Sequence, residues 1–238
     1  MKLLEIRDLK VKVEGRTILN NLNFSMKKGE IHVIFGPNGS GKTSLMLTLI
    51  GIPSYKIVNG KIIFEGKDIT NLKLSERAKL GIFLAFQNPP SIRGVKVANL
   101  LKILNGNENS IKFAGLNEDF LNREINVGFS GGERKKLEIA QAFALKPKLL
   151  LLDEVDSGVD IESLKIIGKS LFKFIHKNEI STIIISHYGY ILKYLKPNRA
   201  HVMIDKEIVC SGSVKKIFNT IKKKGYKWCE RCVKLKKK

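Results

Sequence analysis

A short apolar run followed by a glycine-rich stretch constrains this chain more than any other feature. The run IHVIF (31–35) has the character of a strand buried on both faces, and GPNGSGKT (36–43) follows it directly. This stretch has the spacing G-x-x-x-x-G-K-[S/T], in which glycines let the backbone wrap a phosphate with its N–H groups pointing inward. A helix-like segment, SLMLTLIG (44–51), comes next. Strand, loop and helix in this order predict a phosphate-binding loop.

The chemistry of such a loop gives each residue type an expected role. The Lys42 ammonium is expected to reach the β- and γ-phosphates of a nucleotide, and the Thr43 hydroxyl is expected to coordinate Mg²⁺. An ordinary glycine turn would not require this lysine and threonine at the fixed places. The predicted nucleotide-binding residues are Gly36, Pro37, Asn38, Gly39, Ser40, Gly41, Lys42, Thr43 and Ser44.

Four leucines directly precede a cluster of acids in LLLLDEVDSGVD (149–160). Acids that follow a buried strand emerge at the carboxyl edge of a sheet, where open α/β folds bind their ligands. Asp153 is therefore predicted to hold Mg²⁺ through its waters. Glu154 is predicted to orient or deprotonate the water that attacks the γ-phosphate. The alternative is that the acids cap the next helix, a role open to Asp156 or Ser157.

The order of the remaining segments predicts an α/β fold with a parallel-sheet core, helices on both faces and an antiparallel β layer near the N-terminus. The strand-like runs are 2–13, 16–26, 31–35, 61–65, 148–153, 181–187 and 200–205, and a helix is predicted over 161–177. A mainly helical insertion is expected at about 71–130. We expect one domain over residues 1–238, with a basic, cysteine-containing tail at about 229–238.

Composition excludes several classes of protein. With 43% hydrophobic and 27% charged residues among 238, the chain has the make-up of an ordinary globular protein. No apolar run approaches the ~20 residues that a membrane-spanning helix needs. The N-terminus lacks the apolar core of a signal peptide, and three cysteines make no disulfide framework. A cytoplasmic protein without direct membrane insertion is expected.

The net charge of +21 is concentrated at the C-terminus, where residues 215–238 carry eleven lysines or arginines and one acid, Glu230. Such a tail can bind nucleic acid or anionic lipid, or it can be a solvated, frayed terminus. Because aromatic residues do not alternate with the charges, no nucleic-acid partner is expected. Cys229 and Cys232 form one C-x-x-C, half of a metal site, and Cys210 is expected in the core.

A second glycine turn distinguishes this chain from other nucleotide-binding proteins. The stretch FSGGERKK (129–136) opens a basic helix, where backbone N–H groups and the helix dipole favour an anion. It resembles the signature motif of ABC-type ATPases, usually LSGGQ. Gln87 in LAFQNPP resembles the Q-loop of that family, His187 in IIISHY its switch histidine, and SGVD (157–160) its D-loop. On the basis of these motifs, the chain resembles an ABC-type ATPase domain.

The wording of the motifs resembles the SufC family, the ABC ATPases of iron–sulfur cluster assembly. Transporter subunits usually read DEP after the carboxylate strand, whereas this chain reads DEVDSG. The phrases NVGFSGGERKK (126–136) and GYKW (225–228) add to the likeness, which runs from about residue 3 to 228. The resemblance implies an ATPase that acts on a SufB- or SufD-like scaffold without a membrane channel. The alternative is the ATP-binding subunit of an ABC membrane transporter.

The same resemblance implies an ATP-dependent homodimer. Each ATP would lie between the phosphate loop of one copy and the signature turn of the other. In addition to Glu154, the family pattern implies these site residues: Gln87 and His187 at the γ-phosphate end, Gln87 also as a Mg²⁺ ligand, Ser130, Gly131 and Gly132 in the signature turn, and Asp160 bridging the interface. The scaffold is expected to bind around residues 82–104, where the apolar helix face Val97, Leu100, Leu101 and Leu104 should leave an exposed part.

Overall fold

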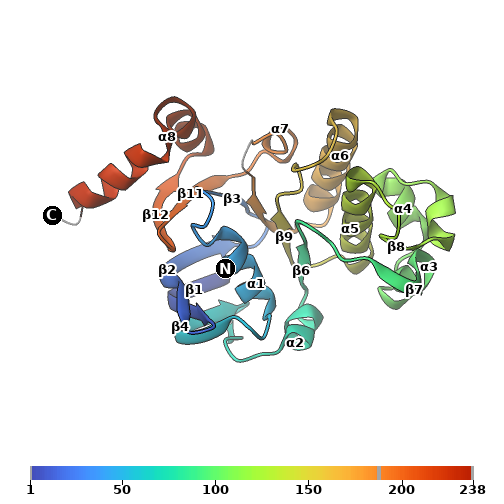
Figure 1. The fold of residues 1–238 in the computed structure, drawn as a ribbon, viewed down its shortest axis with the longest axis horizontal. Helices are drawn as coiled ribbons and strands as arrows, with labels where there is room; N and C mark the ends of the chain where they lie inside the picture. Colours follow the sequence, from blue (N-terminus) through green and yellow to red (C-terminus); the bar gives the residue numbers. More distant parts are fainter. Residues whose placement is uncertain (1, 187–188, 237–238) are drawn as a thin grey trace.

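The computed structural model describes residues 2–186 and 189–236, and a mostly parallel sheet lies at its centre (Figure 1). Within these residues the sheet has six strands in the order β12-β11-β3-β10-β9-β6, and only β12 runs antiparallel to its neighbour. The strands are β3 (Ile31–Phe35), β6 (Ile82–Ala85), β9 (Leu149–Asp153), β10 (Ser181–Ile185), β11 (Arg199–Ile204) and β12 (Glu207–Gly212). Every residue of β3, β9 and β10 is buried, which confirms the predicted central strands.

An antiparallel layer forms from the N-terminal part of the chain, as predicted. Its strands are β1 (Lys2–Val13), β2 (Arg16–Lys27), β4 (Lys56–Phe64) and β5 (Lys67–Asp68). Helix α1 (Lys42–Ile50) places Leu45, Met46 and Leu49 in an apolar core that this layer shares with the central sheet. The core therefore fixes α1, and with it the loop that precedes α1, against both sheets.

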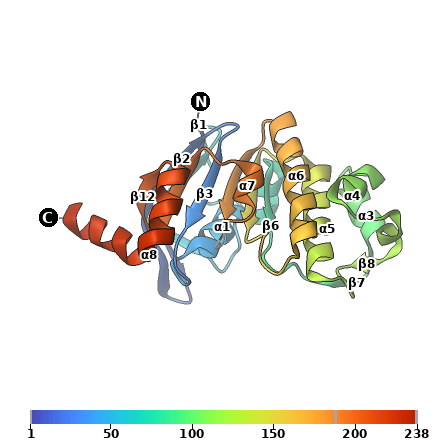
Figure 2. The same cartoon turned by 90° about the horizontal axis from the view of Figure 1, so that it is seen from above.

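Helices cover the other face of the central sheet (Figure 2). They are α5 (Gly131–Leu145), α6 (Ile161–Lys177) and α7 (Leu192–Leu195). A smaller group of elements lies beside α5 at one end of the molecule (Figure 1). This group consists of β7 (Ile92–Lys96), α3 (Val97–Ile103), α4 (Glu108–Ala114), a 3₁₀ helix (Glu118–Asn122) and β8 (Glu124–Ile125).

The expected helical insertion at about 71–130 needs a correction at its start. Strand β6 lies inside this range, yet it pairs with β9 in the central sheet. Helix α2 (Leu74–Lys79) contacts α1 and β6 rather than the peripheral group. The separate helical part therefore begins only after the loop that carries Gln87. The run IFLA is too short for its helical or strand period to be read from the sequence.

The basic C-terminal segment is helical over the described residues and forms α8 (Val214–Lys236). Its first half lies along β11 and β12, and its second half points away from the body of the molecule (Figures 1 and 2). Cys229 is buried, whereas the side chain of Cys232 lies outside the described residues. Cys210 is exposed on the edge strand β12, so its expected place in the core is wrong. No helix in the described ranges is long and apolar enough to cross a membrane.

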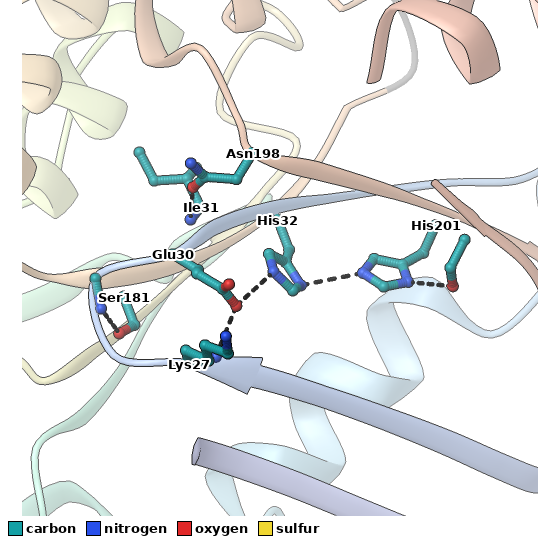
Figure 3. A network of polar contacts seen from close by, with 9 residues as sticks. Lys27, Glu30, Ile31, His32, Ser181, Asn198 and His201 are labelled. Atoms are coloured by element: carbon teal, nitrogen blue, oxygen red, sulfur yellow. Dashed lines mark hydrogen bonds and ion pairs between the residues drawn. The ribbon is translucent and has the colours of Figure 1, made fainter. Parts of the chain in front are cut away.

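Two buried histidines link the neighbouring strands β3, β11 and β12 of the central sheet (Figure 3). His32 on β3 contacts Glu30 (Nε2 to Oε2, 3.1 Å), and its Nδ1 lies 3.0 Å from Nε2 of His201 on β11. His201 in turn contacts the Ser211 hydroxyl on β12 (Nδ1 to Oγ, 2.7 Å). Burial lowers the pKa of both rings, that of His201 to about 3, so both are neutral at pH 7. The network is a structural link inside the fold.

Candidate functional site

The predicted phosphate loop joins β3 to α1 and has the backbone that its glycines require. Gly39 and Gly41 have φ values of 75° and 104°, in the left-handed region that disfavours side chains. A Cβ atom on Gly36 would lie 2.2 Å from the carbonyl oxygen of Met203, so only glycine can stand there. Gly41 caps α1 without a side-chain hydrogen bond, which leaves the first N–H groups of the helix available to an anion.

Lys42 lies inside this loop with only 5% of its surface exposed. Its Nζ donates hydrogen bonds to the carbonyl oxygens of Gly36 (2.9 Å) and Pro37 (3.0 Å). Burial lowers the pKa of Lys42, while the nearby carboxylates of Glu154 and Asp153 act in the opposite direction. The loop thus holds an ammonium group at its mouth, against oxygens that phosphate oxygens could replace.

Asp153 is the last residue of β9 and is 2% exposed. The Thr43 hydroxyl donates a hydrogen bond to its Oδ1 at 3.3 Å, which joins the carboxylate strand to the start of α1. Burial raises the pKa of Asp153 to about 6, and the Thr43 hydrogen bond opposes part of this rise. A hydroxyl and a carboxylate oxygen side by side match the hard oxygen ligands that Mg²⁺ prefers.

Glu154, the next residue, turns sharply out of the strand with φ at 50°, a value that L-residues rarely adopt. Its backbone N–H donates to the carbonyl oxygen of Ile185, and its carboxylate accepts a hydrogen bond of 2.6 Å from Nε2 of Gln87. The two predicted γ-phosphate residues therefore touch, although they are 67 positions apart in the sequence.

A cavity of about 740 Å³ brings Lys42, Thr43, Gln87 and Glu154 together, whereas Asp153 is not part of its lining. The cavity is lined by Ile18, Asn38, Gly39, Gly41, Lys42, Thr43, Ser44, Gln87, Glu154, Ser157, Lys206 and Tyr226. Most of these residues belong to the predicted site. Ser157 was expected only as a helix cap or as part of the D-loop. Ile18, Lys206 and Tyr226 were not predicted, and they come from β2, from the turn between β11 and β12, and from α8. No local pattern in the sequence marks them, because only the fold brings their segments to the loop.

Two residues of α5 that the sequence analysis missed hold the loop around Gln87. Nζ of Lys135 donates to the carbonyl oxygens of Phe86 (2.9 Å) and Gln87 (2.6 Å). The carboxylate of Glu138 accepts from the Phe86 N–H (3.0 Å), and burial raises its pKa to about 7. Both residues are at most 5% exposed. A sequence signal existed, because the two charges stand one helical turn apart on an otherwise apolar face.

The signature turn lies outside the cavity. Ser130 caps α5 through a reciprocal capping box with Glu133, the capping role that the Ser-Gly-Gly turn could also serve. A Cβ atom on Gly131 would meet the carbonyl oxygen of Gly158 at 2.7 Å, and one on Gly132 would meet Oδ2 of Asp160 at 3.5 Å. Within one protomer the signature turn therefore packs on the D-loop and not on the phosphate loop.

The acidic residues that follow Asp153 have different roles. The N-cap of α6 is Asp160, whose Oδ1 accepts from the Ser163 N–H, so neither Asp156 nor Ser157 caps this helix. The Ser163 hydrogen bonds lower the pKa of Asp160. Asp156 is buried, and its Oδ2 accepts from the Ser186 hydroxyl at 2.6 Å. The predicted switch residue His187 lies outside the described residues.

Fold and site together define a class of protein. The protein has a mostly parallel central sheet, which an antiparallel layer flanks. This sheet carries a phosphate loop, a carboxylate strand, a glutamine loop and a signature turn. This is the arrangement of an ABC-type ATPase domain, a nucleotide-hydrolysing cassette.

Comparison with known proteins leads to the same class. The ABC transporter family profile matches residues 19–157, more than half of the chain, and the chain belongs to this family. A protein of Antithamnion sp. called probable ATP-dependent transporter ycf16 is 45% identical over 229 residues, 88% of this chain and 91% of that protein. A nucleotide-free ATP-binding cassette from an ABC transporter has a TM-score of 0.79 and 25% identity, with 94% and 96% of the two chains covered. A dimeric cassette bound to ADP and Pi has a TM-score of 0.77 and 22% identity, with 89% and 99% covered.

Proposed function

We propose that this ATPase closes as a homodimer around ATP and thereby changes the conformation of a SufB- or SufD-like scaffold during iron–sulfur cluster assembly in the cytoplasm. The observation that supports this proposal is the DEVDSG phrase. Its Asp156 is 6% exposed and is bound by the Ser186 hydroxyl and the Ile191 N–H. A buried carboxylate needs such partners, so Asp156 of this phrase has a structural role in the fold.

The loop of residues 36–44 is proposed to bind the phosphates of ATP. Lys42 would exchange its two carbonyl contacts for the β- and γ-phosphates, which offer a charged acceptor instead of a neutral one. Thr43, Asp153 and Gln87 would hold Mg²⁺. The bound ion would supply positive charge to the β- and γ-phosphate oxygens as charge develops on them.

Glu154 is proposed to accept a proton from the attacking water. Its carboxylate faces the cavity beside Lys42, and Gln87 donates to one of its oxygens. Loss of this Gln87 hydrogen bond would let that oxygen accept one from water instead. His187 is proposed at the same γ-phosphate end on the strength of its motif.

A second copy is proposed to complete the site. Ser130, Gly131 and Gly132 do not line the cavity of their own protomer, and the turn keeps Gly131 within reach of the D-loop only. An ATP in one phosphate loop could therefore meet a signature turn only on a partner, with Asp160 near the interface. The cassette bound to ADP and Pi that shares this fold is itself described as dimeric.

The scaffold surface is proposed around residues 82–104, with a change in the residues expected to be exposed. Val97 and Leu101 are buried in the core, and Leu100 and Leu104 are half-buried. The exposed apolar side chain of this helix is instead Ile103, with 75% of its surface free. The placement of the scaffold surface rests on the family resemblance, and Ile103 is the exposed apolar side chain of α3 that a partner would cover.

Affinity purification of the tagged chain from its native host in low salt, followed by mass spectrometry, tests the partner. We expect a soluble scaffold of the SufB type, whose recovery falls for Ile103→Asp. The matched control is Val58→Asp, since Val58 is 50% exposed on the antiparallel layer. Recovery of a polytopic membrane protein without a scaffold would contradict the proposal.

That second outcome would favour the rival function, the ATP-binding subunit of a membrane transporter. The observation behind this alternative is the name of the Antithamnion relative, a probable ATP-dependent transporter. The ATP chemistry of the site would be the same in both cases, so only the partner separates them.

A further inference from the structure

A second cavity, of about 870 Å³, lies where the peripheral group of elements meets the main body of the molecule. Its walls come from the segment between α3 and α4, from α4 itself, and from the C-terminal ends of α5 and α6. Helices α4, α5 and α6 pack against one another at the end of the molecule opposite to α8 (Figure 2). None of the described residues lines both this cavity and the nucleotide cavity, so the two are separate places on the protein.

Three phenylalanines form the apolar part of this second cavity. Phe143 on α5 contacts the other two, with its ring centroid 4.9 Å from that of Phe113 on α4 and 4.5 Å from that of Phe174 on α6. Phe143 and Phe174 are buried, whereas 41% of Phe113 remains exposed. Contacts among these rings therefore hold the wall in place, and Phe113 offers a partly open aromatic surface to one apolar group.

The polar part of the cavity is cationic. It is lined by the exposed lysines Lys112, Lys146, Lys173 and Lys177, and no described acidic residue lines it. Lys112 forms an ion pair with Glu118, whereas the other three lysines have no ion-pair partner within the described part of the chain. The C-terminal ends of α5 and α6 contribute about half a negative charge each, which is too little to neutralise three ammonium groups. The cavity therefore favours an occupant with negative charge.

The backbone of the cavity wall adds a second requirement. Helix α5 ends at Leu145 and α6 ends at Lys177, and the last carbonyl groups of a helix have no N–H partner within that helix. These oxygens accept hydrogen bonds and cannot donate them. A phosphate compound would match the lysines but would bring acceptors to the carbonyl groups, whereas a peptide with Asp or Glu side chains carries both carboxylates and backbone N–H groups. The chemistry of the wall therefore favours an acidic peptide over a phosphate compound.

We propose that this cavity is a docking site for an acidic peptide segment of a partner protein. Carboxylates of the segment would pair with the three lysines that lack an ion pair, and one apolar side chain would lie against Phe113. Backbone N–H groups of the segment would meet the carbonyl ends of α5 and α6. The proposal is independent of the nucleotide site and of the scaffold surface around residues 82–104, because the cavity lies outside both.

A phage-displayed library of random peptides of about twelve residues, selected on the full-length protein, supplies the probes. We expect enrichment of peptides in which Asp or Glu flanks Phe, Leu or Trp, and fluorescence anisotropy then measures their dissociation constants. The double change Lys173→Gln with Lys177→Gln should raise these constants about three- to tenfold, because it removes two exposed charge contacts. Phe113→Ala should raise them about fivefold or more through loss of the apolar contact. Higher salt should weaken peptide binding by the unchanged protein.

The matched control is Lys56→Gln with Lys67→Gln, which changes the net charge equally at exposed positions of the antiparallel layer, outside the cavity. This control should bind the selected peptides as the parent does. Circular dichroism shows whether Phe113→Ala keeps the fold, and the lysine pair tests the site if it does not. The proposal fails if the library yields no acidic binders, or if their affinity is the same with and without Lys173 and Lys177. Inorganic tripolyphosphate that binds through these two lysines in place of the peptides would equally contradict it, since the cavity would then be a phosphate site.

Discussion

The buried carboxylate of Glu138 should make the protein less stable at higher pH. Its pKa is about 7 in the folded protein, against an ordinary value of 4.5, and burial is the main cause. Between these two pH values the folded state binds more protons than the unfolded state, so stability falls as pH rises. The full difference corresponds to about 3 kcal/mol of unfolding free energy, reached above pH 7.

Replacement of Glu138 by glutamine should remove this loss. The amide oxygen can still accept the Phe86 N–H, but it carries no charge to desolvate. Near pH 4.5 the variant should match the parent, and at pH 8 it should be more stable by up to about 3 kcal/mol. In urea this amounts to a midpoint shift of about 1 M.

Urea unfolding at pH 4.5 and 8, followed by circular dichroism, measures the effect. Glu162→Gln on the exposed face of α6 is the control and should show no such difference. Glu138→Leu, which cannot hold the Phe86 N–H, should disturb the Gln87 loop and lower ATP turnover, whereas Glu138→Gln should not. A Glu138→Gln variant that is less stable than the parent at pH 8 would refute the reasoning.

Two further predictions concern the catalytic carboxylates. Glu154→Gln should still bind Mg·ATP, but its turnover should fall by ~10²–10⁴, the usual contribution of a positioned general base. The ATP that is bound but not hydrolysed should then hold a dimer that size-exclusion chromatography detects. Near-normal phosphate release by this variant would remove Glu154 from the mechanism. Burial raises the pKa of Asp153 to about 6, so this side chain is mostly protonated at pH 5 and cannot then bind Mg²⁺ as a carboxylate. The Mg²⁺-dependent part of the ATP affinity should therefore fall about tenfold from pH 7 to pH 5. Isothermal titration would show the fall, and its persistence in Asp153→Asn would contradict the assignment.

The residues that sequence could predict are those whose chemistry is local. The phosphate loop needs its glycines, Lys42 and Thr43 within one turn, and the apolar run before Asp153 marks a strand without help from the rest of the chain. The contact between Thr43 and Asp153 then follows from the fold class, since both stand at the carboxyl edge of the sheet.

The residues that sequence missed depend on distant partners. Lys135 and Glu138 acquire their role only because α5 packs beside the Phe86–Gln87 segment. Cys210 is exposed because β12 is an edge strand, which an alternating run cannot reveal. Asp160 caps α6 because the helix begins at Ile161, and the role of Asp156 is set instead by Ser186, 30 positions away, whose hydroxyl donates to its carboxylate. In each case tertiary contacts decide between roles that the local pattern leaves open.

Glu30, His32, His201 and Ser211 form a chain of hydrogen bonds, and the carboxylate of Glu30 determines which atom donates in each of them. A carboxylate only accepts, so Nε2 of His32 must carry the proton and Nδ1 must accept. His201 then donates from Nε2 and accepts at Nδ1, which obliges the Ser211 hydroxyl to donate. A donor in place of Glu30, such as lysine, would demand the reverse order at every step. The tautomers of two rings on neighbouring strands, and the orientation of a hydroxyl on the edge strand, are thus set by a single negative charge at the start of β3.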